Sequence, residues 1–132
     1  LIMQGHKARA RIYPIGAITK GREGKELSDI GEMVDAGAVA ISDDGNPLRN
    51  ANLMRNALTY AKMFNIPVIS HCEDLDLAAG GVMNEGEFGA RLGLLGIPKA
   101  AETVMLERDI RLVALSGGRY HAASITCASS ST

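Results

Sequence analysis

Apolar positions along the chain follow two patterns that alternate with each other. Short continuous apolar runs, such as 38–41 and 66–70, predict strands that are buried on both faces. Longer segments repeat apolar residues every three or four positions, as 52–64 does, and predict amphipathic helices. The predicted strands cover 9–15, 38–41, 66–70 and 120–126, and the predicted helices cover 26–36, 52–64 and 98–116. A glycine-rich loop is expected over 80–96, and a frayed tail over 128–132.

The alternation of strand and helix predicts an α/β fold with a parallel sheet. About four parallel strands with intervening helices fit part of a (β/α)8 TIM-type barrel, and they also fit a small doubly wound sheet. A Rossmann fold is disfavoured because no GxGxxG motif follows a predicted strand. The whole chain, 1–132, is expected to form one such unit.

Composition and charge exclude some functions. Of the 132 residues, 46% are hydrophobic and 22% charged, and the net charge of −1 gives no electrostatic case for binding nucleic acid or a membrane surface. No apolar run approaches the roughly 20 residues of a membrane helix. Cys72 and Cys127 form no CxxC pattern, which favours reduced thiols and a cytoplasmic protein. The chain begins with Leu1 rather than Met, and we expect that it starts inside a longer protein.

Candidate chemistry lies where the predicted strands end, because parallel α/β folds gather their working residues at the carboxyl ends of strands. The second strand ends in Ser-Asp-Asp-Gly at 42–45, the third in His-Cys-Glu-Asp at 71–74, and the fourth carries His121 and Ser124. A carboxylate and an imidazole on neighbouring strand ends can share a divalent ion such as zinc. A metal there could polarise an amide carbonyl and activate water.

Structural interpretations of the same residues stay open. Asp-Asp-Gly is a frequent turn whose carboxylates often cap the next helix, and Glu73 and Asp74 could serve a helix N-terminus. A single histidine at a strand end is more often a hydrogen-bonded structural residue than a ligand. For Cys72, a buried and unreactive thiol is the commoner outcome.

Two other polar segments are expected to be solvated. The stretch 19–25 is basic and glycine-rich, but it lacks the order of a phosphate-binding loop and is interpreted as a turn. Glu102, Glu107, Arg108 and Asp109 lie on the last predicted helix, and we expect them to form exposed pairs there.

Several segments in fixed order resemble bacterial dihydroorotases, and the resemblance runs from about Tyr13 to Ser124. These segments are AITKGREGKEL at 17–27, AISDDGNP at 40–47, ISHCED at 69–74, MNEG at 83–86, and LGLLGIP at 92–98, which is followed by Ala101-Glu102. Several ordered motifs together are far more specific than any one of them.

The resemblance implies a TIM-type barrel of the amidohydrolase superfamily that catalyses the reversible hydrolysis of dihydroorotate to N-carbamoyl-L-aspartate in pyrimidine biosynthesis, normally with zinc. By motif position, Asp44 matches a bridging metal ligand and His71 a histidine ligand. The family's main substrate-binding residues are not matched in this chain, so the catalytic and substrate-binding residues remain unknown.

The chain also departs from the family pattern. It contains no H-x-H pair, which the family carries on its first barrel strand, and the family's late catalytic Asp has no match. Where the family reads roughly H-x-x-H-V-S-T, this chain reads HAASITC at 121–127, so Ser124 stands at the position of a second histidine ligand. A neutral hydroxyl is a poor substitute for imidazole on zinc.

Three interpretations follow: part of an active dihydroorotase, a non-catalytic dihydroorotase-like subunit that scaffolds aspartate transcarbamoylase, or another cyclic-amide hydrolase such as an allantoinase. The last usually keeps a bridging Lys, and none follows 38–41. The resemblance implies a small-molecule substrate as one partner. Further copies of the chain are also expected partners, because half a barrel leaves strand edges and apolar faces open. For the isolated chain we expect an incomplete site and negligible activity.

Overall fold

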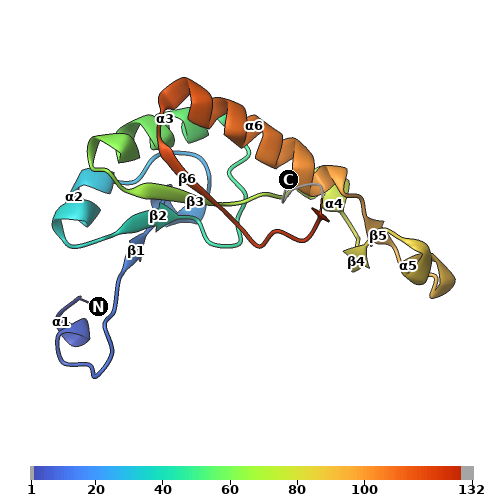
Figure 1. Ribbon diagram of the computed structural model, residues 1–132, viewed down its shortest axis with the longest axis horizontal. Helices are drawn as coiled ribbons and strands as arrows, with labels where there is room; N and C mark the ends of the chain where they lie inside the picture. Colours follow the sequence, from blue (N-terminus) through green and yellow to red (C-terminus); the bar gives the residue numbers. More distant parts are fainter. Residues whose placement is uncertain (1, 129–132) are drawn as a thin grey trace.

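The computed structural model describes residues 2–128 and contains a four-stranded parallel sheet (Figure 1). Its strands are β1 (Ile15–Gly16), β2 (Ala40–Ser42), β3 (Pro67–His71) and β6 (Arg119–Ala123), in the order β1-β2-β3-β6. The register pairs Ile15 with Ala40, Ser42 with Ile69, and His71 with Ala123. The predicted α/β class with four parallel strands is confirmed, and within the described residues the sheet is open and no barrel closes.

Helices connect the strands and pack on one face of the sheet (Figure 1). They are α2 (Ile30–Asp35), α3 (Ala51–Met63) and α6 (Ala100–Ser116). α3 buries Met54, Ala57, Leu58 and Ala61, which recur at helical spacing, and the Asn50 side chain caps its first turn by accepting from the Leu53 amide at 3.1 Å. α6 ends at Gly117, whose φ of 68° is the left-handed conformation that glycine adopts without strain.

The core lies between this helical layer and the sheet. Its fully enclosed side chains come from both layers, and Ile41 and Val68 of the strands meet Met54 and Leu58 of α3. Along β3, Val68 and Ser70 are buried while Pro67, Ile69 and His71 are only partly buried. The prediction that the strands are buried on both faces therefore holds for Ala40 and Ile41 of β2. It is wrong for β3 and β6, because the helices cover one face of the sheet there and leave the other partly accessible.

The first predicted strand and the first predicted helix are shorter than expected. Only Ile15 and Gly16 pair with β2, while Ile12 and Tyr13 are exposed. A β-favouring segment becomes a strand only where a neighbouring strand offers its hydrogen bonds. The helix predicted over 26–36 begins only at Ile30. Residues 26–29 are not helical, because Leu27 forms a β-bridge with Thr19 and the Ser28 amide donates to the Ile18 carbonyl at 3.0 Å.

The segment predicted as a glycine-rich loop contains small elements that no periodicity indicated. α4 (Leu75–Ala78) precedes it, β4 (Met83–Asn84) pairs in parallel with β5 (Gly96–Ile97), and α5 (Glu87–Arg91) lies between these two strands. They project from one end of the molecule, opposite α1 (Ile2–Gly5) (Figure 1). Such short elements carry too few residues for a hydrophobic period to be visible.

The predicted tail lies outside the described residues except for Ala128. Among residues 2–128, no helix combines the length and the apolar character needed to cross a membrane.

Candidate functional site

The carboxyl ends of β2, β3 and β6 lie next to one another along one edge of the sheet. Ser42 of β2 pairs with Ile69 of β3. Asp44 comes two residues after Ser42, and His71 comes two residues after Ile69. The fold therefore brings the two sequence-predicted ligands to the same edge of the sheet. This is the edge at which α/β proteins of this type place their working residues.

The two neighbouring aspartates at the end of β2 have different roles. Asp43 is 3% exposed, and its carboxylate accepts from the Ile18 amide at 2.9 Å, the Thr19 amide at 3.0 Å and the Thr19 hydroxyl. It thereby ties the loop after β1 to the end of β2. The expected turn forms at Asp-Asp-Gly, because the Asn46 amide donates to the Asp43 carbonyl. The expectation that a carboxylate there caps the next helix is wrong for Asp43, which caps the loop after β1, while Asn50 caps α3.

Asp44 makes none of these carboxylate hydrogen bonds with the loop after β1. Its side chain is 89% exposed, its φ is 57°, and its carboxylate lies 3.6 Å from the Arg22 guanidinium. A left-handed conformation is tolerated by Asp and turns the side chain away from the path of the strand. Asp44 lines a hollow of about 340 Å³ together with Arg22, Ser42 and the β1 end at 15–17. Its carboxylate is thus available to a ligand.

His71 ends β3 on the face that the helices do not cover. Its Nε2 lies 3.2 Å from Oε2 of Glu73, and the two side chains are about equally shielded, at 24% and 30% exposure. Asp74 instead caps α4, accepting from the Asp76 and Leu77 amides at 3.0 and 3.1 Å. The prediction that Glu73 and Asp74 stabilise a helix N-terminus is confirmed for Asp74. Glu73 instead contacts His71.

His71 lines a second hollow, of about 120 Å³, which differs from the one that Asp44 lines. Glu73, Asn84, Ser124 and Thr126 also line it. Ser124 follows β6 directly, with a φ of 58°, so this residue at the position of an expected histidine does face the hollow of His71. His121 is exposed in the middle of β6, level with Ile69, and lies away from the strand end.

Two carboxylates of α6 that were expected to be exposed are buried, so that prediction is wrong. Asp109 is 0% exposed and Glu102 8%. Glu102 accepts from the Thr126 amide at 2.9 Å and the Cys127 amide at 3.2 Å, which ties the segment after β6 to α6, and all three residues line the His71 hollow. Both residues lie on the same helix face as Met105 and Leu106, and a carboxylate on an apolar stripe was the signal available in the sequence.

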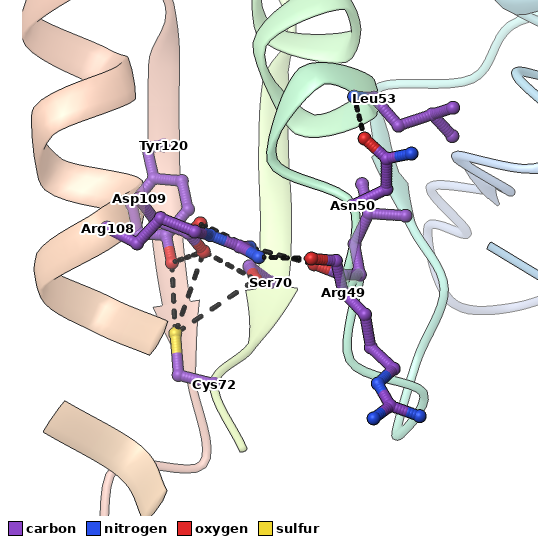
Figure 2. A network of polar contacts seen from close by, with 9 residues as sticks. Arg49, Asn50, Leu53, Ser70, Cys72, Arg108, Asp109 and Tyr120 are labelled. Atoms are coloured by element: carbon purple, nitrogen blue, oxygen red, sulfur yellow. Dashed lines mark hydrogen bonds and ion pairs between the residues drawn. The ribbon is translucent and has the colours of Figure 1, made fainter. Parts of the chain in front are cut away.

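Asp109 stands at the centre of a polar network between α6 and the sheet (Figure 2). The Tyr120 hydroxyl donates to its carboxylate at 2.8 Å, and the Ser70 hydroxyl does so at 3.0 Å. Cys72 lies 3.0 Å from the Tyr120 oxygen. Burial raises the pKa of the Cys72 thiol and the pKa of the Tyr120 phenol above their ordinary values. Cys72 is 5% exposed, which confirms the expectation of a buried thiol.

The donors at this edge fit a zinc ion in type but not in number. Imidazole and carboxylate are both zinc ligands, and Asp44 and His71 offer one each. Across residues 2–128, no three His, Cys, Asp or Glu side chains are grouped so that they could hold a metal ion. Asp44 and His71 also line separate hollows, so these residues alone make at most half of a metal centre.

Comparison with known proteins now gives the family. The sequence profile of the family described as Dihydro-orotase-like matches residues 3–130. A dihydroorotase of Pelotomaculum thermopropionicum is 56% identical over 126 residues, covering 96% of this chain and 30% of that protein. Dihydroorotases of Solibacter usitatus and Acetivibrio thermocellus are 56% and 58% identical, over 91% and 87% of this chain and 28% and 27% of those proteins.

Sequence identity is high across this chain, but the aligned region is a limited part of each relative. The chain spans about 30% of the length of the curated relatives it matches. Within that span, the profile includes both strand ends that carry Asp44 and His71. By its profile and by its identity to these proteins, the chain belongs to the dihydroorotase-like family of hydrolases.

Proposed function

We propose that the protein carrying this chain is a dihydroorotase, which reversibly hydrolyses dihydroorotate to N-carbamoyl-L-aspartate. The relatives that bear this name are more than half identical to the chain. The structural observation that carries the proposal is the division of labour at the end of β2. The hydrogen bonds of Asp43 hold the loop after β1, whereas Asp44 is exposed, with only Arg22 beside its carboxylate among the described residues, at the end of the strand next to that of His71.

The proposed metal is zinc, with Asp44 and His71 each contributing one ligand. Further ligands would have to come from elsewhere in the protein or from a second copy of the chain, because no three His, Cys, Asp or Glu side chains are grouped as a metal site within residues 2–128. When bound, zinc supplies Lewis acidity that polarises the ring amide and lowers the pKa of water. In this chain Arg22 faces the Asp44 carboxylate and Glu73 faces the His71 imidazole, so each proposed ligand already has a partner that would orient it.

Ser124 favours one competing function. A hydroxyl in the hollow of His71, at the position where the family has a histidine, weakens any metal site there. A non-catalytic dihydroorotase-like subunit that scaffolds aspartate transcarbamoylase is therefore the second candidate. An allantoinase-like activity has less support, because the end of β2 offers Ser42, Asp43 and Asp44 and no lysine.

Zinc content distinguishes the two leading functions. In the protein that carries this chain we expect near-stoichiometric bound zinc that depends on Asp44, and we expect Asp44→Asn to lose it. Asparagine suits this variant because it tolerates the positive φ while removing the charge. Elemental mass spectrometry after desalting measures the ratio, with Asp76→Asn as the control because Asp76 is also exposed and paired with an arginine. Absence of zinc from the unmodified protein would favour the scaffold.

The second expected result is negligible dihydroorotase turnover by the 132-residue chain alone. Two ligands do not complete a catalytic zinc site, which uses three protein ligands and an open position. Absorbance of dihydroorotate, followed with added zinc and at several enzyme concentrations, measures the rate. Turnover that rises with zinc and with chain concentration would show that copies of the chain complete the site, and would contradict this expectation.

A further inference from the structure

Asp109 and its neighbour Arg108 on α6 connect three separate segments of the chain (Figure 2). One oxygen of the Asp109 carboxylate accepts hydrogen bonds from the hydroxyls of Ser70 on β3 and Tyr120 on β6. The Arg108 guanidinium donates to the other oxygen of Asp109 at 2.6 and 2.9 Å. It also donates to the carbonyls of Leu48 at 2.8 Å and Arg49 at 2.9 Å, in the loop that follows Asp44.

The same three segments carry the edge residues of the candidate site. Asp44 precedes the loop that Arg108 holds, and β6 leads from Tyr120 to Ser124. His71 stands between Ser70 and Cys72, both of which face α6 and belong to the network. Successive side chains of a strand point to opposite faces, so fixing Ser70 and Cys72 toward the helix directs His71 to the other face.

Stability alone is a weak reason for such a network. A fully enclosed carboxylate costs desolvation, and replacing a buried ion pair with apolar side chains is often neutral or favourable. The surrounding positions of α6, Met105 and Leu106, show that apolar packing suits this face. Apolar side chains would not fix the relative positions of the three segments. Each hydrogen bond here does so, because it holds one atom of one segment at a defined place relative to the others.

We propose that Asp109 and Arg108 are positioning residues that hold the Asp44 loop, the His71 strand and the end of β6 in the mutual arrangement needed to bind the metal ion. The inference rests on the proposed function, in which Asp44 and His71 are metal ligands. Neither α6 residue touches the metal, and their effect passes through backbone carbonyls and through Ser70 and Tyr120.

The test compares Arg108→Lys and Asp109→Asn with the unmodified protein that carries this chain. Lysine keeps the charge of Arg108 but lacks the planar fork that reaches the carboxylate and two carbonyls together. Glu107→Gln, exposed on the same helix, is the control. The probe is Co²⁺ alone, titrated by visible absorption at a temperature where far-ultraviolet circular dichroism shows every variant folded. Backbone amide hydrogen exchange is measured in parallel.

We expect the dissociation constant for Co²⁺ to rise about tenfold or more in Arg108→Lys and Asp109→Asn, as it does when outer partners of metal ligands are lost. Amide exchange should quicken at 45–49 and 70–73 and stay unchanged within α3. If Asp109→Asn fails to fold, Arg108→Lys alone decides the matter.

Unchanged Co²⁺ affinity in folded variants, or exchange that quickens equally in α3, would overturn the inference and reduce the pair to ordinary stabilisation. Failure of the unmodified protein to bind Co²⁺ would refute the proposed function and the inference with it. Binding by the unmodified protein with no change in either variant would refute the inference alone.

Discussion

Replacing Asp43 with alanine is expected to lower the free energy of unfolding by about 3 kcal/mol or more, because three buried donors lose their acceptor. These donors are the amides of Ile18 and Thr19 and the hydroxyl of Thr19, and both of these residues are at most 1% exposed. The Thr19 hydroxyl also accepts from the Gly24 amide at 3.0 Å, so the whole loop after β1 should loosen. Urea unfolding followed by circular dichroism measures the change.

The matched control is Asp44→Asn at the adjacent position. Its side chain is 89% exposed and its ion pair with Arg22 is a long, solvated contact, so the stability should change by no more than about 0.5 kcal/mol. The expected pattern is therefore one aspartate that matters for folding and one that matters for metal binding. Equal destabilisation by the two variants would contradict this division of labour.

Replacing Leu58 with alanine is expected to destabilise the fold by about 2–5 kcal/mol, the usual cost of truncating an enclosed leucine. Leu58 is 0% exposed in the core between α3 and the sheet. The backbone of Gly118 approaches it so closely that a Cβ there would lie 2.9 Å from the Leu58 carbonyl oxygen and 3.2 Å from its Cβ. Such close packing leaves little room for the surroundings to collapse into the space, which favours the upper part of the range.

Met63→Ala on the same helix is the control for this prediction. Met63 is 73% exposed, and alanine is a good helix former, so the expected change stays within about 0.5 kcal/mol. Urea midpoints and slopes measured for both variants separate a lost contact from a changed unfolded state. A Leu58→Ala midpoint close to that of Met63→Ala would show that the core between α3 and the sheet contributes little to the stability of this chain.

The parts of the fold that the sequence predicted well are those with a long, regular period. α3 was expected over 52–64 and occupies Ala51–Met63, because its apolar stripe, its cap at Asn50 and its length agree. β3 was expected over 66–70 and occupies Pro67–His71. The extent of β1 and the start of α2 were predicted poorly, because pairing partners at 40 and 19 decide them and these are distant in sequence.

For the candidate site too, the sequence predicted some features and not others. Motif positions singled out Asp44 and His71, and the fold does place both at one edge of the sheet. Which of the two neighbouring aspartates is buried could not be read from the sequence, because their residue type is identical. The Ile18 and Thr19 donors lie more than 20 residues away, and they alone make Asp43 the structural one.

By itself, the sequence determined the alternating strands and helices, the parallel sheet and the family, because these depend on local periodicity and on ordered motifs. Only the tertiary structure decided that Asp109 and Glu102 are buried, that the helices cover one face of the sheet, and that Asp44 and His71 line separate hollows. The physical reason is that a carboxylate is stable inside a protein only where distant donors converge on it. That convergence is set by how the layers pack and leaves no mark within a short stretch of sequence.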